Sequence, residues 1–247
     1  MMTLSRYTDP SKVLRGIGRR LLIAGLNANR YDMSRNGEAH VVQKLSQSLE
    51  LVIDVGANVG DWAAEVLKVT PKAKVFCVEA IPEFAAKIES RFGDTVTVLR
   101  TAVSNGDGEI TLYKSAGGAR AVPLNTSKKL ERRDVSCISG DSLVEKIEAD
   151  TVSFIKIDVD GYDLPVIKSF SSTIDRFLPV VQFEYSRFWI GTRHYLKDAF
   201  DFFSSRGYEV GRIMPHRIEF KDYTVSDETF MTNNFLAVPK QRLALLS

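Results

Sequence analysis

Short apolar runs alternate with amphipathic stretches along most of this chain from residue 51 onward. The apolar runs predict five strands that are buried on both faces, at 51–55, 74–79, 95–103, 152–159 and 179–185. Between several of them apolar residues recur at helical spacing, as they do at 82–92. Strands that alternate with helices predict βαβ units, and hence a parallel sheet with helices on both faces.

Two more strands are expected later in the chain, at 208–214 and 233–238. The polar segment 215–231 lacks a helical pattern long enough for a crossover, so these strands are expected to form a hairpin with one antiparallel strand. The predicted fold class is therefore α/β, with a mostly parallel, seven-stranded, Rossmann-like sheet whose last strand is antiparallel.

The region after the third predicted strand has a clear turn signal and few apolar residues. Asn105-Gly-Asp-Gly108 is typical of a tight turn, so 109–113 is expected to return as a short strand in a hairpin with 95–103. Residues 114–135 show no period and carry several Lys and Arg residues, so they are expected to form a mobile loop.

Residues 1–50 are expected to form a helical extension packed on the α/β unit at 51–247, the two making one globular domain. The apolar residues at helical spacing in the first helix are Val13, Leu14, Ile17, Leu21 and Ala24. Lys and Arg residues lie between them. Two interpretations stay open: a helix packed on the domain with its arginines in water, or one that binds a membrane surface or a partner.

The composition is that of an ordinary globular protein. Of the 247 residues, 44% are hydrophobic and 26% are charged, and a net charge of +2 gives no electrostatic case for nucleic acid. Two cysteines are too few for a disulfide scaffold or a zinc site and suit a reducing compartment, so a cytoplasmic location is expected. We find no apolar run long enough to span a bilayer and no signal-peptide pattern, which leaves peripheral membrane contact as the open alternative.

Candidate ligand chemistry begins where the first strand passes through a glycine-containing turn into a helix. The turn holds Gly56, Ala57, Asn58 and Gly60. Such a turn brings bare backbone N–H groups close to a ligand. A dinucleotide-binding turn needs Gly-x-Gly-x-x-Gly, but Asn58 and Asp61 occupy the second and third glycine positions. Asp61 would also put negative charge where a pyrophosphate must bind, so the turn disfavours NAD and FAD.

A nucleoside without phosphates fits these residues better, and S-adenosylmethionine is the candidate. Asp54, at the end of the first strand, is expected to accept hydrogen bonds from the cationic end of this cofactor. Glu79 ends the next strand and is expected to accept both ribose hydroxyls, as acids do in dinucleotide folds. Ala102 and Val103, at the end of the third strand, offer small apolar surface for adenine.

Four segments together resemble the FkbM family of S-adenosylmethionine-dependent methyltransferases. They are Val52-Ile-Asp-Val-Gly-Ala-Asn-Val-Gly60, Val78-Glu79-Ala80, Lys156-Ile-Asp-Val-Asp-Gly161 and Phe183-Glu184, and the resemblance also takes in Asn36-Gly-Glu38. It implies a class I methyltransferase sheet and methyl transfer to oxygen, often to sugar hydroxyls of glycolipids, polysaccharides or glycosylated natural products. It also implies that Ala80 and Ile81, next to Glu79, contact the cofactor.

Acidic residues at the ends of the fourth and fifth predicted strands are the candidates for catalysis. Asp158 and Asp160 are two apart and share a face if the strand continues. Asp158 is expected near the sulfonium and methyl or on the acceptor, and with Asp160 and Glu184 it could form a magnesium site. A hydroxyl acceptor also needs a base, for which Asp158, Asp160 and His194 are the candidates. The family usually has Asp-Val-Glu-Gly-x-Glu here, so the shorter acids of this chain change the distances to any metal or substrate.

The leading interpretation is an O-methyltransferase whose partner is a small-molecule or glycan acceptor. Two other classes stay open. One is a module that binds S-adenosylmethionine without catalysis. The other is a nicotinamide-dependent dehydrogenase, which Asn58 and Asp61 disfavour.

Overall fold

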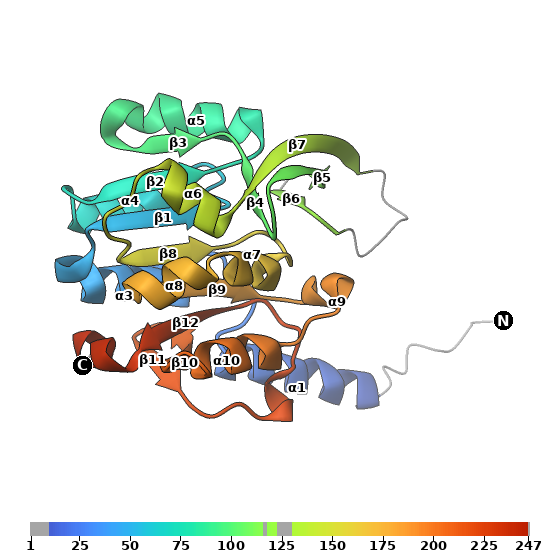
Figure 1. Ribbon diagram of the computed structural model, residues 1–247. Coiled ribbons are helices and arrows are strands. Elements are labelled where there is room, and N and C mark those ends of the chain that lie inside the picture. Colours follow the sequence, from blue (N-terminus) through green and yellow to red (C-terminus); the bar gives the residue numbers. More distant parts are fainter. Residues whose placement is uncertain (1–9, 116–117, 123–129, 247) are drawn as a thin grey trace.

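The computed structural model describes residues 10–115, 118–122 and 130–246 of the chain. Within them, eight strands form a main sheet in the order β11-β10-β12-β9-β8-β1-β2-β3 (Figure 1). These strands are β1 (Leu51–Val55), β2 (Lys74–Val78), β3 (Thr97–Leu99), β8 (Phe154–Ile157), β9 (Val180–Tyr185), β10 (Tyr208–Met214), β11 (Arg217–Phe220) and β12 (Asn233–Pro239). The strands from β3 to β9 in this order are parallel, and β12 is antiparallel to both of its neighbours. The predicted fold class is confirmed, with β11 as an edge strand that the sequence did not reveal.

Helices cover both faces of the main sheet, and each face has its own hydrophobic core. One face is covered by α6 (Gly140–Lys146), α7 (Asp163–Ser169), α8 (Ser171–Phe177) and α10 (Leu196–Ser204), and the other by α3 (Glu38–Leu45), α4 (Asp61–Val69) and α5 (Pro82–Phe92). Along β1 the side chains alternate, because Ile53 and Val55 pack in the first core and Val52 packs in the second. All five residues of β1 are buried, as expected of a strand covered on both sides.

A second, four-stranded sheet lies beside the main one, in the order β4-β7-β5-β6 (Figure 1). Its strands are β4 (Ala102–Ser104), β5 (Gly108–Ser115), β6 (Gly118–Arg120) and β7 (Glu131–Ser139). The strand predicted at 95–103 is therefore two strands, β3 and β4, in different sheets. Between them the Thr101 hydroxyl donates to the Ser136 carbonyl at 3.0 Å, which holds the chain against β7.

The predicted hairpin of 109–113 with 95–103 is wrong. β5 pairs antiparallel with β7 and β6, while β4 pairs with β7 in parallel. Part of the loop predicted at 114–135 is also strand, because β6 and the start of β7 lie in it, and its residues 116–117 and 123–129 lie outside the described ones. β7 was missed because its first residues are mostly exposed and charged, so they carry no apolar run.

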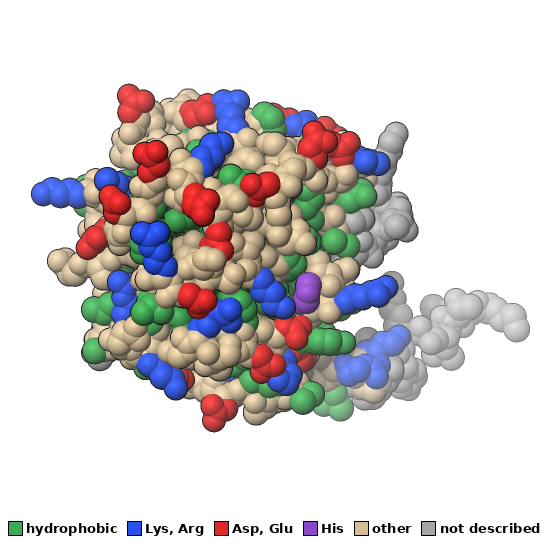
Figure 2. Space-filling model, in the orientation of Figure 1, with side chains coloured by type: hydrophobic (Ala, Val, Ile, Leu, Met, Phe, Trp, Pro, Cys, Tyr) green, Lys and Arg blue, Asp and Glu red, His purple; other side chains and the backbone are tan. Residues whose placement is uncertain are grey.

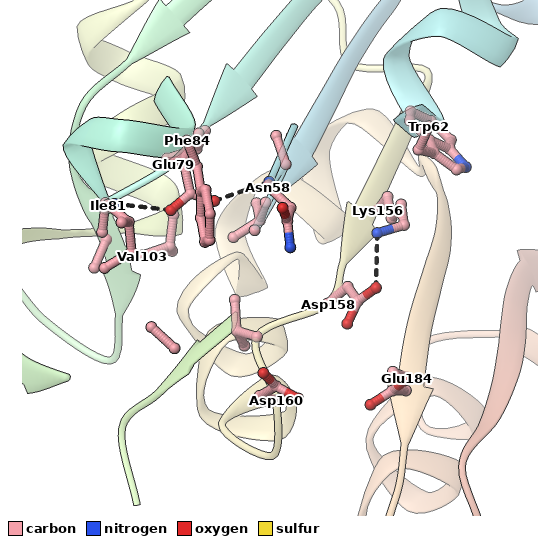
Figure 3. A pocket seen from close by; sticks show the side chains of 18 of the residues that line it. Asn58, Trp62, Glu79, Ile81, Phe84, Val103, Lys156, Asp158, Asp160 and Glu184 are labelled. Atoms are coloured by element: carbon pink, nitrogen blue, oxygen red, sulfur yellow. Dashed lines mark hydrogen bonds and ion pairs between the residues drawn. The ribbon is translucent and has the colours of Figure 1, made fainter. Parts of the chain in front are cut away.

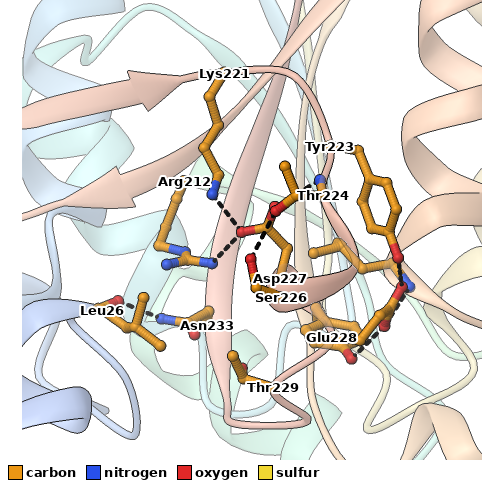
Figure 4. A network of polar contacts seen from close by, with 12 residues as sticks. Leu26, Arg212, Lys221, Tyr223, Thr224, Ser226, Asp227, Glu228, Thr229 and Asn233 are labelled. Atoms are coloured by element: carbon orange, nitrogen blue, oxygen red, sulfur yellow. Dashed lines mark hydrogen bonds and ion pairs between the residues drawn. The ribbon is translucent and has the colours of Figure 1, made fainter.

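The N-terminal helices behave differently from one another. α3 packs Val41, Val42 and Leu45 into the second core. In contrast, α1 (Pro10–Gly25) leaves its apolar residues exposed, so the packed interpretation of this helix is wrong. The chain is fixed just after α1, where the Asn233 side chain donates to the Leu26 carbonyl at 2.8 Å (Figure 4). The short helices α2 (Met33–Asn36) and α9 (Trp189–Thr192) are the remaining α-helices of the described residues, which also contain short 3-10 helices at Ser46–Ser48, Gly93–Thr95, Val225–Asp227 and Lys240–Leu246. No helix in the described part of the chain has the length and apolarity to cross a membrane.

Candidate functional site

A cavity of about 410 Å³ opens at the carboxyl ends of β1, β2 and β8 (Figure 3). β1 lies at the centre of the parallel sheet, with β2 on one side and β8 on the other. This is the point where the strand order reverses and where open α/β sheets bind their ligands. The second sheet supplies a further wall through Ile110 and Leu112 of β5.

Most of the residues predicted from the sequence meet in this cavity. Its lining includes Gly56, Ala57, Asn58, Glu79, Ala80, Ile81, Ala102, Val103, Asp158, Asp160 and Glu184. Three predicted residues, Asp54, Gly60 and His194, are not part of the lining. Gly60 instead precedes α4 at a φ of 80°, where a Cβ would lie 2.6 Å from the Phe92 ring.

The turn after β1 is built so closely against the loop after β8 that only glycine fits at position 56. Gly56 has a φ of 79°, and a Cβ on it would lie 2.0 Å from the backbone oxygen of Asp158. The N–H groups of Gly56 and Ala57 donate to the Val78 carbonyl at 3.0 and 3.2 Å. Since these amides already have protein partners, the turn offers a surface to a ligand and not the bare donors that the sequence suggested.

Glu79 ties together the turns that follow β1 and β2. One carboxylate oxygen accepts from the Asn58 N–H and the other from the Ile81 N–H, both at 2.8 Å (Figure 3). Burial raises the pKa of Glu79, and these two hydrogen bonds oppose the shift. A carboxylate has about four lone-pair directions, so each oxygen keeps one for a ligand in the cavity.

We expect Glu79→Ala to lower the free energy of unfolding by about 3 kcal/mol, because two buried charge-assisted hydrogen bonds are lost. Urea unfolding followed by circular dichroism measures this. Glu83→Ala is the matched control, since Glu83 is an exposed acid of α5 whose ion pairs with Lys114 and Arg133 lie at the surface. Equal losses in the two variants would contradict a tying role for Glu79.

Lys156 separates Asp54 from the cavity. Its Nζ lies 3.0 Å from Asp158 Oδ2 and 3.7 Å from Asp54 Oδ1, and Asp54 itself is 0% exposed. Burial by itself would lower the pKa of Lys156, but the carboxylates of Asp158, Asp54 and Glu38 raise it overall. Lys156 is therefore protonated and holds Asp158 at the cavity wall. Asp54 lies on the other side of that lysine from Asp158 and is fully buried, so its predicted contact with a ligand stays a prediction.

Two further acids at this end of the cavity have raised pKa values. Burial and the nearby Asp158 raise the pKa of Asp160 to about 6, against the opposing charge of Arg120. Burial, followed by the charges of Asp158, Asp163 and Asp160, raises the pKa of Glu184 well above its usual value. Nonetheless, within the described residues no three His, Cys, Asp or Glu side chains are grouped as a metal site. The magnesium site predicted at Asp158, Asp160 and Glu184 therefore has no support.

The segment before His194 is anchored in the core. Trp189 is fully buried, and its ring centroid lies 5.3 Å from that of Tyr185. Arg193 then takes a left-handed conformation with a φ of 58°, and the His194 N–H donates to the Trp189 carbonyl. His194 is not among the residues that line the cavity, so its role as a base stays a prediction that this geometry does not support.

Comparison with known proteins identifies the family. Residues 54–210 match the Methyltransferase FkbM domain. The chain belongs to this family. The earlier resemblance is thereby confirmed over the segment that contains both the turn after β1 and the acids after β8.

Two relatives of the FkbM chain carry names that describe a reaction. It is 31% identical over 147 residues to the hexuronic acid methyltransferase AglP of Haloferax volcanii, covering 56% of this chain and 58% of that protein. It is also 31% identical over 94 residues to the 2-O-methyltransferase NoeI of Sinorhizobium fredii, covering 37% and 39%. The matched region thus spans less than two thirds of the length of either relative.

The fold of the FkbM chain is that of class I methyltransferases. An O-methyltransferase from Bacillus cereus, solved in complex with SAH, superposes with a TM-score of 0.51 at 11% identity. The match covers 95% of this chain and 94% of that one. The predicted class I sheet is confirmed.

Among the lining residues that were not predicted for the site, Glu38 is an acid. Glu38, at the start of α3, lines the cavity and accepts hydrogen bonds from the side chains of Asn36, Gln182 and Asn234 at 2.6, 3.0 and 2.7 Å. Gly37 allows this arrangement, since a Cβ there would lie 2.1 Å from the Met214 carbonyl. The sequence pointed to this residue only through the segment Asn36-Gly-Glu38, which is part of the resemblance to the FkbM family but has no predicted role in the site.

Proposed function

We propose that this chain is an S-adenosylmethionine-dependent O-methyltransferase that methylates a hydroxyl of a sugar. One observation carries the proposal. A single cavity joins the two turns tied by Glu79 to an acid-rich end at Asp158, Asp160 and Glu184 (Figure 3). The first part suits a nucleoside, and the second suits a cation next to a hydroxyl acceptor.

The charges of the cavity fit this cofactor and disfavour a dinucleotide. The acids that line it are Glu38, Asp61, Glu79, Asp158, Asp160 and Glu184, and among the described lining residues Lys156 is the one basic side chain. An excess of carboxylates around a cavity favours a ligand with positive charge and opposes a pyrophosphate. A volume of about 410 Å³ lies in the usual range for small-ligand pockets, about 300–1,000 Å³.

The two ends of the cavity suggest an orientation for the bound cofactor. Ile81, Phe84 and Val103 give an apolar surface beside Glu79, which suits adenine and its ribose (Figure 3). The acids at the other end suit the sulfonium. When bound, S-adenosylmethionine supplies the electrophilic methyl group, so the protein has to orient the acceptor and remove its proton. Such orientation contributes up to about 7–11 kcal/mol in related reactions.

Asp160 is our candidate for the residue that accepts the proton of the acceptor hydroxyl. It lines the cavity, and its pKa of about 6 keeps it ionised yet basic near neutral pH. Asp158 is held by Lys156, so we assign it to positioning the acceptor or the cationic end of the cofactor. A sugar acceptor is supported by the names of the two relatives, which refer to a hexuronic acid and to 2-O-methylation.

Titration calorimetry and a transfer assay test the proposal. S-adenosylmethionine is expected to bind the full chain, and Glu79→Ala is expected to weaken binding by about a hundredfold or more. Transfer of labelled methyl to uronic acids, neutral sugars or their glycosides is expected to yield an O-methyl product. Failure to bind would overturn the cofactor assignment, and binding of NADH in its place would favour a dehydrogenase. Binding without transfer to any sugar of the panel would favour a non-catalytic module.

A further inference from the structure

The first helix presents an apolar surface to solvent. The side chains of Val13, Leu14, Ile17 and Leu21 are 49, 68, 50 and 69% exposed. At 3.6 residues per turn these four residues fall within an arc of about 100° on one side of α1. A helix that packed on the domain would bury such a stripe, so this face of α1 has no partner within the described chain.

The other side of the same helix is mainly basic, with Leu22, which is 46% exposed, beside its Lys and Arg side chains. Lys12, Arg15 and Arg19 lie opposite the apolar stripe, Arg20 lies at its edge, and no Asp or Glu occurs between residues 10 and 31. Figure 2 shows basic side chains gathered where the outer part of α1 leaves the body. A narrow apolar stripe with Lys and Arg and without acids is the composition of helices that lie in the interface of an anionic membrane.

The attachment of α1 connects this surface to the cavity. Asn27, two residues beyond the helix, donates through its side chain to the carbonyls of Asn36 and Ile213 at 2.7 and 3.2 Å. Four residues later Tyr31 lines the cavity and is itself 80% exposed. The helix is therefore joined to the mouth of the cavity by a short, hydrogen-bonded segment.

We infer that α1 docks the protein on an anionic lipid surface, with its apolar stripe among the acyl chains and its basic side chains at the headgroups. The mouth of the cavity then lies close to the membrane. A second copy of the chain is a weaker occupant, because its α1 would bring a like charge to the same face. The inference does not depend on which reaction the cavity performs.

Co-sedimentation of the full chain with vesicles tests the inference. The protein is expected to sediment with vesicles of phosphatidylcholine and phosphatidylglycerol, and not with phosphatidylcholine alone. Leu14→Ser combined with Leu21→Ser is expected to weaken binding more than about tenfold. Arg19→Gln combined with Arg20→Gln is expected to weaken it by about 25-fold, and added salt is expected to weaken the wild type in the same direction.

Two control variants make the same kinds of substitution at exposed residues outside α1. Val225→Ser removes an exposed apolar side chain, and Lys72→Gln with Lys74→Gln removes two exposed charges. Both controls are expected to bind vesicles like the wild type. No binding by the wild type would overturn the inference, as would equal losses in the controls. Self-association that Leu14→Ser and Leu21→Ser abolish would also overturn it, since the stripe would then be an interface between copies.

Discussion

Replacing Gly56 by alanine is expected to abolish cofactor binding and to lower the free energy of unfolding by about 3–5 kcal/mol. A Cβ at this position would lie 2.0 Å from the backbone oxygen of Asp158. To relieve this overlap, the turn after β1 or the loop after β8 would have to move. The φ of 79° adds the strain of a left-handed conformation, about 1–2 kcal/mol for a residue with a side chain. Urea unfolding and calorimetry with S-adenosylmethionine measure the two losses.

Gly207→Ala is the control that separates the backbone strain of a positive φ from the steric overlap of the added Cβ. Gly207 has nearly the same φ, 76°, but a Cβ there would meet no atom within 4 Å. This variant is expected to lose only about 1 kcal/mol of stability and to bind the cofactor like the wild type. If both variants lost the same amount, the close approach of the turn to Asp158 would not be what requires glycine at position 56.

Replacing Asp160 by asparagine is expected to lower the rate of methyl transfer by about 10²–10⁴-fold while the affinity for S-adenosylmethionine changes little. Asparagine tolerates the left-handed conformation that Asp160 adopts, with a φ of 52°. Since a base must be ionised and burial raises the pKa of Asp160 to about 6, the wild-type rate is expected to rise through pH 6 and then level off. That rise is expected to be missing in the variant.

The free energy of unfolding of Asp160→Asn shows whether a lower rate comes from lost catalysis or from an unfolded protein. An aspartate whose folded pKa lies above its unfolded value, about 3.9, costs stability as the pH rises from about 4 to about 6. Asp160→Asn removes that cost, so the variant is expected to be as stable as the wild type at pH 7 or more so. Asp94→Asn, on an exposed turn, serves as the control with an unchanged rate. A variant that kept both the rate and its rise through pH 6 would exclude Asp160 as the base.

The main sheet could be predicted from the sequence because its strands are buried on both faces. Continuous apolar runs such as 51–55 mark such strands without help from tertiary contacts. The second sheet could not be predicted in the same way. Its strands β5 and β7 have exposed, charged positions, and they pair across 16 intervening residues, from Lys114 to Glu131 at the near ends. Local turn chemistry at 105–108 correctly gave the turn but suggested the wrong partner.

In the cavity, the prediction succeeded for acids at the carboxyl ends of strands of the main sheet. Glu79 and Asp158 follow directly on β2 and β8, Glu184 is the last residue but one of β9, and all three line the cavity. It did not reveal the ion pair of Asp54 with Lys156, a tertiary contact that leaves Lys156 in the cavity lining and Asp54 fully buried. The roles of Glu79 and Asp160 toward a ligand are predictions that the variants above test.

The two sheets share no strand in the described chain, although both line the same cavity. The wall formed by Ile110 and Leu112 can therefore be exchanged without changing the register of β1, β2 and β8. If the proposed function holds, such modularity lets acceptor preference change while the half of the cavity around Glu79 is kept. It also makes the segment between β4 and α6 the natural unit to transplant when an enzyme of this fold is to be redirected to a new acceptor.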